Sequence, residues 1–460
     1  MEAILPKKTA LITPARIIIA SFLLLIFVGM FFLALPFSRS GSFVISWWDA
    51  FFVSASAVST TGFMSIPLAS FSFWGKLVIL CLMQLGGLGL LTLFVPILGL
   101  FKNVRMRTHL ITGQQFDLQQ WSSNWLYSKK IIQFVVCFSF LVEIIGAGIL
   151  YFSLKDVSAL GEPRWFAALF HSVSSYCNFG VSIFSEPFSF FVTNRVFMIV
   201  TTLLIALGSF GFVPLYECIL WFSGLFFKRS GPRYRFSLQS KMILVYMPLL
   251  TVILATFLLI AEWKTLGEYH WFDRLSIVLM NGFSYRSCGF STFNFLQLSQ
   301  VAFFVTMVFC LLGSSPGSVG GGSGLKITTL ALSLASIKSI VSGRENVELF
   351  KRRIPKEQVL VTLAFLSIYL LWLVTMIFMV LVSEGSTTTS FVHIIFESVS
   401  AIANRGISVG SFVSMTRAGQ LLLTVGMIIG RLNSLSLLLA IKQKRERVHF
   451  KYPEETFSMS

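Results

Sequence analysis

Four glycines in this sequence are each preceded by a similar run of small, polar and aromatic residues. Aligned on the glycine, the runs read FVSASAVSTTGF (52–63), FHSVSSYCNFGV (170–181), LMNGFSYRSCGF (279–290) and FESVSAIANRGI (396–407). The aligned glycines are Gly62, Gly180, Gly289 and Gly406, at intervals of about 115 residues, which indicates internal duplication of one unit. One such glycine alone would fit an ordinary helix C-cap. Four in register favour a shared function.

The tripeptides that end in these glycines could coordinate a monovalent cation through main-chain oxygens. They are Thr60-Thr61-Gly62, Asn178-Phe179-Gly180, Ser287-Cys288-Gly289 and Asn404-Arg405-Gly406. A cation that leaves water must have its hydration shell replaced by other oxygens, and consecutive backbone carbonyls can supply them. Glycine permits the required backbone angles and a close approach to an axis. The first residue of each tripeptide is small and polar, so its side-chain oxygen could add to the inner end of such a filter.

Apolar runs flank each of these motifs. We predict eight membrane spans, each near or above the ~20 residues that a bilayer requires. They lie near 17–37, 74–101, 131–153, 195–227, 242–262, 300–342, 359–383 and 418–442. Each motif lies between two spans, in a stretch too short and polar to be another span. Because non-helical backbone at membrane depth is tolerated only inside protein or along a cavity, each motif predicts a half-helix and a pore loop.

The predicted fold is an all-α polytopic membrane protein. Four repeats of spanning helix, pore loop and spanning helix (M1, P and M2) would surround one central pore, with the negative dipole ends of the half-helices directed at the cation. We place the repeats at 1–115, 116–235, 236–352 and, with a cytosolic tail, 353–460.

Composition agrees with a membrane location. Hydrophobic residues make up 55% of the chain, charged residues only 12%, and the mean hydropathy is +0.81. A soluble domain is about 25% charged, so this chain cannot cover a water-facing surface of its own size. The net charge of +17 invites nucleic-acid binding, but the basic residues fall in alternate connections, as the positive-inside rule expects. We expect a multi-pass protein of the cell (inner) membrane, in contact with lipid, with both termini cytoplasmic and no nucleic-acid partner.

The sequence does not indicate catalysis. The six cysteines form no Cys-x-x-Cys pair, and the five histidines show no ligand spacing. A membrane enzyme would need clustered acidic residues or histidines, whereas Glu143 and Glu217 are isolated in apolar runs and are expected to pair with polar neighbours. A proton- or Na⁺-coupled carrier is a further alternative. Such carriers often use inverted repeats, while the four repeats here run in one direction, which suits a pore.

The repeats and their order resemble the TrkH/KtrB/HKT superfamily of K⁺ transporters over about residues 15–445. Residues 285–290 (YRSCGF) are similar to that family's TRTAGF, and residues 396–401 (FESVSA) to its FEVVSA. With one predicted span before Gly62, the chain is closest to the KtrB type. The resemblance implies uptake of K⁺, no organic cofactor, a homodimer, and a cytosolic nucleotide-binding regulatory subunit of the KtrA/TrkA type.

Two further expectations follow from the resemblance. Members with serine at the position of Gly62 tend towards Na⁺, so glycine favours K⁺, and a Na⁺-permeable or Na⁺-coupled transporter stays an alternative. The basic connections 228–241 and 344–356 are candidate docking surfaces for the regulatory subunit, with contact to anionic lipid as the competing interpretation.

A glycine- and serine-rich segment, residues 313–326, interrupts the sixth apolar run. It cannot hold a stable helix, because each Gly costs ~1 kcal/mol relative to Ala and Pro breaks the helix. The segment resembles the family's intramembrane loop, which implies a mobile gate under the filter. A packing kink is the alternative, but it would need only one or two such residues. The gate residues expected here are Gly317, Ser318, Gly320, Gly321, Gly322 and Lys326.

Two arginines lie at membrane depth. A charge there is costly and usually faces a cavity or a partner. The resemblance implies that Arg431 faces the pore, raises an electrostatic barrier below the filter and assists gating. The alternative is a structural arginine bonded to helix-end carbonyls. Arg405 departs from the family, which usually has a small or apolar residue there, and we hypothesise that it lies behind the filter, paired with Glu397.

Overall fold

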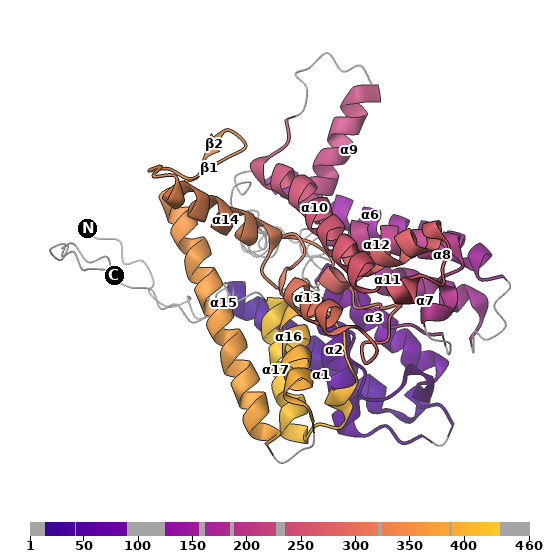
Figure 1. The fold of residues 1–460 in the computed structure, drawn as a ribbon. Helices are drawn as coiled ribbons and strands as arrows, with labels where there is room; N and C mark the ends of the chain where they lie inside the picture. The colour runs from indigo at the N-terminus through magenta and orange to yellow at the C-terminus, as the bar shows by residue number, and fades with distance from the viewer. Residues whose placement is uncertain are drawn as a thin grey trace, which may run out of the picture.

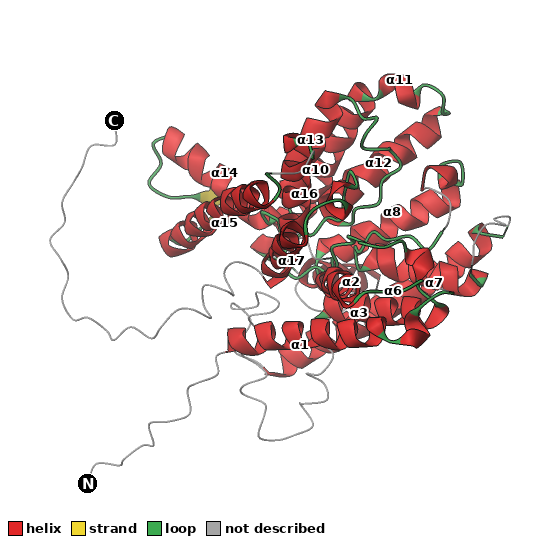
Figure 2. Ribbon diagram, turned by 90° about the horizontal axis from the view of Figure 1, so that it is seen from below, coloured by secondary structure: helices red, strands yellow, loops and turns green. Residues whose placement is uncertain are grey.

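The computed structural model shows a bundle of helices (Figure 1). It describes residues 14–41, 43–89, 125–155, 162–184, 188–226, 235–320, 324–385 and 389–432. Within these ranges the only sheet is an antiparallel hairpin of two short strands, β1 (Glu348–Leu349) and β2 (Arg352–Arg353), drawn in yellow in Figure 2. The helical class predicted from the sequence is therefore confirmed.

Short helices alternate with longer or paired ones along the chain. The first helices are α1 (Pro14–Ala34), α2 (Trp47–Ser59) and α3 (Phe73–Leu88). Next come α6 (Trp125–Ser153), α7 (Arg164–Tyr176), α8 (Arg195–Phe210) and α9 (Phe212–Phe226). They are followed by α10 (Leu238–Ala261), α11 (Trp263–Leu266), α12 (Trp271–Ser287), α13 (Gln300–Leu311) and α14 (Ile327–Val341). The last are α15 (Lys356–Ser383), α16 (Phe391–Ala403) and α17 (Arg417–Leu432). Single 3-10 turns are formed by Pro36–Ser38, Leu68–Ser70, Phe188–Phe191 and Ser411–Val413.

The helices α2, α7, α12 and α16 precede the four aligned glycines and contain 13 to 17 residues. At a rise of 1.5 Å per residue, they measure roughly 20–25 Å. The hydrocarbon core of a bilayer is ~30 Å thick, so these helices are too short to cross it. Their C-terminal parts are buried, as in α2, where every residue from Phe52 to Ser59 is buried. They therefore enter the bundle and end inside it, as expected of half-helices.

Each short helix also packs against a helix from the preceding part of the chain. Helix α7 contacts α3, α12 contacts α8, and α16 contacts α13. The series closes because α2 contacts α17, which comes from the opposite end of the described chain (Figure 1). The four parts of the chain are thus arranged in a closed ring.

Three described helical segments are long and apolar enough to cross a bilayer: Gln133–Ser153 within α6, α10 and α15. A fourth results if α8 and α9 are taken as one span, although they are bent by 104°. Large apolar side chains project outward from the long helices; Phe152 is 77% exposed and Leu371 is 68% exposed. A surface of this kind suits contact with lipid, where apolar atoms need no cover from water.

The remaining predicted spans correspond to shorter helices. In the run 74–101, helix α3 ends at Leu88, and residues 90–101 lie outside the described part. The run 300–342 is divided into α13 and α14 by the glycine-rich segment, as predicted. The run 195–227 was predicted as one span but is broken at Gly211, whose φ is +85°. Continuous apolarity does not reveal this break, because its cause is a contact with a distant loop, described below.

Candidate functional site

The four aligned glycines meet at the centre of the ring. All four have left-handed φ angles, from +67° to +105°, which glycine adopts without strain. A methyl group on each would collide with a carbonyl oxygen of the neighbouring tripeptide: Gly62 with Phe179, Gly180 with Cys288, Gly289 with Arg405, and Gly406 with Thr61. This order runs from the first tripeptide through the fourth and back to the first. The structure therefore brings all four predicted tripeptides together around one point.

The short helices position the tripeptides through the same hydrogen bond in each case. A main-chain N–H of the tripeptide donates to the carbonyl of a serine near the end of the helix. The pairs are Thr61 N with Ser56 O (2.9 Å), Phe179 N with Ser174 O (2.8 Å), Gly289 N with Ser284 O (3.0 Å) and Arg405 N with Ser400 O (3.0 Å). Such bonds satisfy helix-end carbonyls and stop the helix in a fixed geometry.

In the third tripeptide, the helix ends closer to the glycine than in the other three, and the hydrogen-bonded N–H lies one residue later. Thr60, Asn178 and Asn404 adopt the left-handed conformation, with φ of 50° to 55°. In the third unit α12 continues through Ser287, and Cys288 has a φ of −111°. The bonded N–H is then that of the glycine itself. The fourfold sequence alignment is therefore correct at the glycines, while the preceding residue differs in backbone conformation.

Serine hydroxyls form hydrogen bonds with the tripeptides or with the residues that directly follow them. These bonds were not predicted from the sequence. Ser56 Oγ accepts a hydrogen bond from Gly62 N (3.1 Å). Ser174 Oγ and Ser284 Oγ donate to the carbonyls of Val181 (2.8 Å) and Phe290 (2.6 Å), directly after their glycines. Serine recurs at nearly the same distance before each glycine, so the signal was present in the aligned motifs.

In the fourth unit the carboxylate of Glu397 accepts hydrogen bonds from the loop that follows Gly406. Glu397 Oε1 accepts from Ser408 Oγ (2.6 Å), Val409 N (3.2 Å) and Ser411 Oγ (3.2 Å). Glu397 is completely buried. Since a buried carboxylate is tolerated only with such partners, this loop is held firmly against α16.

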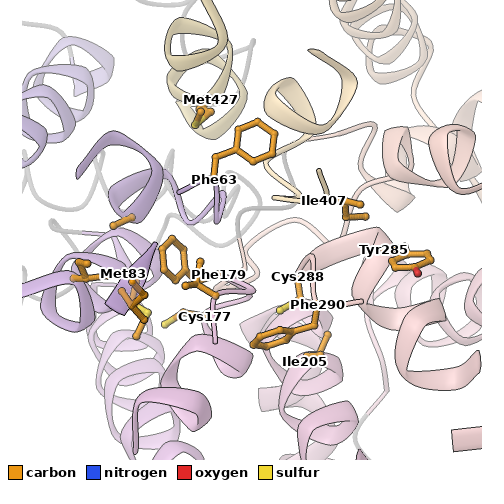
Figure 3. Close-up of a cluster of buried hydrophobic side chains, with 14 of the residues drawn as sticks. Phe63, Met83, Cys177, Phe179, Ile205, Tyr285, Cys288, Phe290, Ile407 and Met427 are labelled. Atoms are coloured by element: carbon orange, nitrogen blue, oxygen red, sulfur yellow. The ribbon is translucent and has the colours of Figure 1, made fainter. Parts of the chain in front are cut away.

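The second residue of each tripeptide buries its side chain in the surrounding protein. Thr61, Phe179, Cys288 and Arg405 are all fully buried. Figure 3 shows Phe179 and Cys288 among the packed apolar residues, with Phe63, Phe290 and Ile407 from the positions after three of the glycines. Side chains therefore fill the space behind the tripeptides, and the main-chain carbonyls are the groups that meet the neighbouring glycines.

The small polar residues that open the tripeptides make hydrogen bonds to protein. Thr60 Oγ1 accepts from Arg431 (3.1 Å), Asn404 Nδ2 donates to Thr61 Oγ1 (2.7 Å), and Ser287 Oγ donates to Phe283 O (2.8 Å). Asn178 Nδ2 donates to Tyr176 O (3.3 Å), while its Oδ1 is buried without a hydrogen-bond partner. The Oδ1 of Asn178 is thus a side-chain oxygen of the tripeptides that protein donors leave unsatisfied within the described residues.

Arg405 points away from the ring, towards the end of α13. Its Nε donates to Cys310 O (3.1 Å) and its Nη2 to Leu312 O (3.4 Å). The carbonyls at a helix C-terminus carry partial negative charge, which suits a guanidinium. The hypothesised pairing with Glu397 is wrong, because that carboxylate is occupied by the loop after Gly406 and forms no ion pair within the described residues.

The segment predicted as a gate is anchored to the end of α8. Phe212 N donates to Gly317 O (3.0 Å), Ser315 N donates to Ser209 O (3.2 Å), and Val319 N donates to Gly208 O (3.0 Å). A methyl group on Gly211 would collide with Ser315 Oγ, which explains why the helix breaks there at a glycine. The segment thus takes the place of the next helical turn and satisfies the carbonyls at the end of α8.

The predicted gate residues are only partly described. Gly317, Ser318 and Gly320 lie in the anchored part, where a methyl group on Gly320 would collide with Asn178. Lys326 is the residue that immediately precedes α14. Gly321 and Gly322 lie outside the described residues. Gly320 therefore lies directly beside the second tripeptide.

Arg431 joins the first tripeptide, α3 and the glycine-rich segment. Its Nη1 donates to Thr60 Oγ1 (3.1 Å), and its Nη2 donates to Gly86 O (2.5 Å), Gly87 O (3.0 Å) and Val319 O (3.1 Å). The bonds to Gly86 and Gly87 match the alternative of an arginine bonded to helix-end carbonyls. The bond to Val319 connects it to the segment predicted as a gate.

The isolated acidic residues have polar neighbours, as expected. Gln84 Nε2 donates to Glu143 Oε2 (2.9 Å), and Cys177 Sγ lies 3.2 Å from Gln84 Oε1. Ser237 N donates to Glu217 Oε2 (2.9 Å). The network of Glu143 lies behind the second tripeptide, next to Cys177, and it was not predicted from the sequence.

Comparison with known proteins identifies the architecture. The family model "TrkH: Cation transport protein" matches residues 7–449. The Ktr system potassium uptake protein B of Bacillus subtilis (strain 168) is 29% identical over 452 residues, which cover 96% of each chain. The potassium/sodium uptake protein NtpJ of Enterococcus hirae is 29% identical over 458 residues, or 97% of each chain.

A solved structure agrees with the fold over nearly the whole length. The crystal structure of the potassium transporter TrkH from Vibrio parahaemolyticus superposes with a TM-score of 0.70 at 20% sequence identity. The match covers 95% of this chain and 87% of that one. At this identity the likeness concerns the fold.

Proposed function

The chain belongs to the TrkH family of cation transport proteins, and from this premise we propose that it takes up K⁺ through a pore lined by the four tripeptides. It is a membrane transport protein and not an enzyme. The resemblance noted in the sequence is confirmed by the family match. The observation that carries the proposal is the closed ring in which each central glycine meets a carbonyl oxygen of the next tripeptide.

In the proposed filter, main-chain oxygens of Thr60 to Gly62 and their three counterparts replace the water of a passing ion. Carbonyl oxygens directed at one point repel each other, and a positive charge between them offsets this repulsion. The ring therefore favours cations. The C-terminal ends of α2, α7, α12 and α16 add partial negative charge. Each of the four units 1–115, 116–235, 236–352 and 353–460 would supply one quarter of the filter, as M1–P–M2 repeats with eight spans.

The proposed gate is the segment 313–326. Its anchored part bonds to the end of α8 and to Arg431, and both attachments consist of a few hydrogen bonds that can break without unfolding a helix. The gate would open when these bonds are exchanged for others. The positive charge of Arg431, directly beneath Thr60, would add a barrier to cations while the gate is closed.

We further propose a homodimer in the cell (inner) membrane, with cytoplasmic termini and a cytosolic nucleotide-binding regulatory subunit of the KtrA/TrkA type. Two relatives are named as components of a Ktr system, which supports a second subunit. The basic connections 228–241 and 344–356 are its proposed docking surfaces, although residues 228–234 lie outside the described part.

Transport of Na⁺ together with or instead of K⁺ is the second candidate. It is favoured by one observation, the similarity to a protein named as a potassium/sodium uptake protein. Uptake of ⁸⁶Rb⁺ into proteoliposomes, with Na⁺ as competitor, separates the two. Strong competition by K⁺ and weak competition by Na⁺ support a K⁺ filter, and equal competition contradicts it.

A filter variant tests the site itself. Gly289→Ala places a methyl group against the Arg405 carbonyl at a φ of +105°, a conformation that costs an L-residue about 1–3 kcal/mol. We expect ⁸⁶Rb⁺ uptake to fall by about tenfold or more. Gly148→Ala is the matched control, because that glycine is in α6 with open space around it. Normal uptake by Gly289→Ala would refute the proposed filter.

A further inference from the structure

A cleft far from the filter lies where two membrane-spanning helices begin. Its volume is about 470 Å³, and its walls come from the start of α10, the start of α15, strand β2 and one residue of α9. Both α10 and α15 are among the helices long and apolar enough to span a bilayer. The ends of such helices lie at the level of the lipid headgroups. The cleft therefore opens at the boundary between lipid and water.

Three arginines line this cleft from two separate parts of the chain. Arg235 precedes α10, and Arg352 and Arg353 form β2. All three are exposed, and within the described residues none of them forms an ion pair. Glu348 is the cross-strand neighbour of Arg353, but its ion pair is with Arg344, at 3.9 Å. Three positive charges without ion pairs, against the single carboxylate of Glu217 in the same cleft, favour binding of an anion.

The main chain adds to the positive potential of the cleft. Ser237, Leu238 and Gln239 line it from the first turn of α10, and Pro355 and Gln358 from the start of α15. The N-terminus of a helix carries partial positive charge and N–H donors, a combination that binds phosphate. Helix α15 begins at Lys356, and its N-cap residue Pro355 provides no side-chain hydrogen bond. Two helix starts and three arginine residues thus line one cavity.

One buried carboxylate oxygen in the cleft still needs a donor. Glu217 is 1% exposed and lines the cavity. Its Oε2 accepts from Ser237 N, while its Oε1 has no hydrogen-bond partner. A buried acceptor without a partner is costly, so a ligand that brings a hydroxyl or ammonium group is favoured. A phosphodiester linked to an alcohol such as glycerol carries both an anion and such a donor.

We propose that this cleft is a binding site for a phosphate group, supplied by the headgroup of an anionic phospholipid such as phosphatidylglycerol or by a soluble phosphate compound. The phosphate accepts hydrogen bonds from Arg235, Arg352 and Arg353 in the geometry that guanidinium groups favour. A headgroup hydroxyl donates to Glu217 Oε1. The location at the headgroup level favours the lipid as the source. Arg235, Arg352 and Arg353 are thereby assigned to phosphate, and the docking proposed above for the connections 228–241 and 344–356 rests on their other basic residues. The site does not depend on ion conduction.

Lipid binding tests the proposal on the purified full-length protein in lipid-free detergent. Phosphatidylglycerol is titrated in, and bound lipid is counted by native mass spectrometry. We expect one lipid per chain, or two per proposed homodimer, to bind more tightly than all others, and the double variant R352A/R353A to lower that affinity by about tenfold or more. The double variant K351A/K356A is the matched control, because it removes two charges from neighbouring residues that do not line the cleft.

The source of the phosphate is decided by a second arm with inorganic phosphate. A site for soluble phosphate as well is supported if millimolar phosphate displaces the tightly bound lipid. It is also supported if phosphate raises the unfolding temperature of the wild-type protein but not that of R352A/R353A. Circular dichroism and gel filtration check that both double variants are folded, and R352Q/R353Q repeats the test with polar side chains. ⁸⁶Rb⁺ uptake is recorded separately, so a failed filter proposal leaves this result unaffected.

Two outcomes would overturn the proposal. If R352A/R353A and K351A/K356A weaken lipid binding equally, the attraction is diffuse surface charge and not a site. If neither phosphatidylglycerol nor phosphate binds more weakly to R352A/R353A than to the wild type, the cleft does not recognise phosphate. In the second case, loss of binding of an acidic protein partner by R352A/R353A would reassign the cleft to protein docking.

Discussion

At the scale of single residues, the least expected feature is an arginine next to one of the four central glycines. Arg405 would repel K⁺ if its side chain faced the ring. It instead lies in a fully buried position and donates to two carbonyls at the end of α13. Its carbonyl oxygen still meets Gly289. The main chain and the side chain of Arg405 therefore point in opposite directions, so a basic residue here is compatible with the proposed filter.

We expect Arg405→Met to destabilise the protein without increasing transport. The variant keeps much of the volume but leaves the carbonyls of Cys310 and Leu312 without these donors, at a cost of about 1–3 kcal/mol in the free energy of unfolding. Denaturant unfolding in mixed micelles measures the loss, and Arg405→Lys, which retains a charged donor, should lose less. A large gain in ⁸⁶Rb⁺ uptake by Arg405→Met would instead mean that the charge obstructs the ion path.

At the scale of elements, broken helices create the room for the glycine-rich segment. Helix α8 ends at Phe210, and the segment continues its hydrogen bonding through Ser315 and Val319. The chain then resumes in α9 at an angle of 104°. A straight helix through Gly211 would occupy the space of the glycine-rich segment. The segment can therefore pack here only because α8 ends at Phe210, and it supplies the hydrogen bonds that the end of α8 needs.

Gly211→Ala should therefore destabilise the protein. Alanine at a φ of +85° is strained, and its methyl group would collide with Ser315, so we expect a loss of about 1–3 kcal/mol. Gly224→Ala provides the comparison within α9, since that glycine has open space around it and alanine favours the helix by up to ~1 kcal/mol. Unfolding temperatures of the two variants should shift in opposite directions. A shift in the same direction would argue against strain at the break.

At the scale of the whole molecule, the ring closes between the first and last parts of the chain. Helix α2 packs on α17, and Trp48 Nε1 donates to Gln420 Oε1 (2.6 Å) across this contact. Phe412 stacks on Phe52 and Phe63, with ring centroids 5.8 Å and 4.7 Å apart. Without this contact the fourth tripeptide would not meet the first, because Gly406 faces the Thr61 carbonyl.

A double-mutant cycle on Trp48→Phe and Gln420→Leu measures the coupling free energy of the hydrogen bond that joins α2 to α17. We expect a coupling of about 1 kcal/mol in the free energy of unfolding, the usual net value of an intramolecular hydrogen bond. The pair Trp263→Phe and Gln420→Leu is the control and should be additive, because Trp263 is exposed on α11 and the side-chain hydrogen bonds of Gln420 go to Trp48, Phe412 and Val413. Additivity in the Trp48 cycle would show that this bond does not contribute to closing the ring.

Much of the architecture was encoded locally and could be predicted. The glycines with their preceding small residues predicted four half-helices that end at a turn, since glycine tolerates left-handed angles and helix ends need such a residue. Low charge and long apolar runs predicted a membrane protein. The glycine- and serine-rich segment predicted the break between α13 and α14, because such residues do not sustain a helix.

Other features were decided only by the tertiary structure. The partners of Arg405, the break at Gly211 and the bonds of Arg431 all depend on residues that are distant in the chain, such as Cys310, Ser315 and Val319. A local pattern records the conformation that a segment prefers, but it does not record which carbonyl lies opposite a given side chain. The aligned motifs and the composition therefore sufficed to predict the four short helices and the membrane setting. The closure of the ring and the direction of each buried charge required the packed molecule, because only packing determines which polar groups lose water and must find each other.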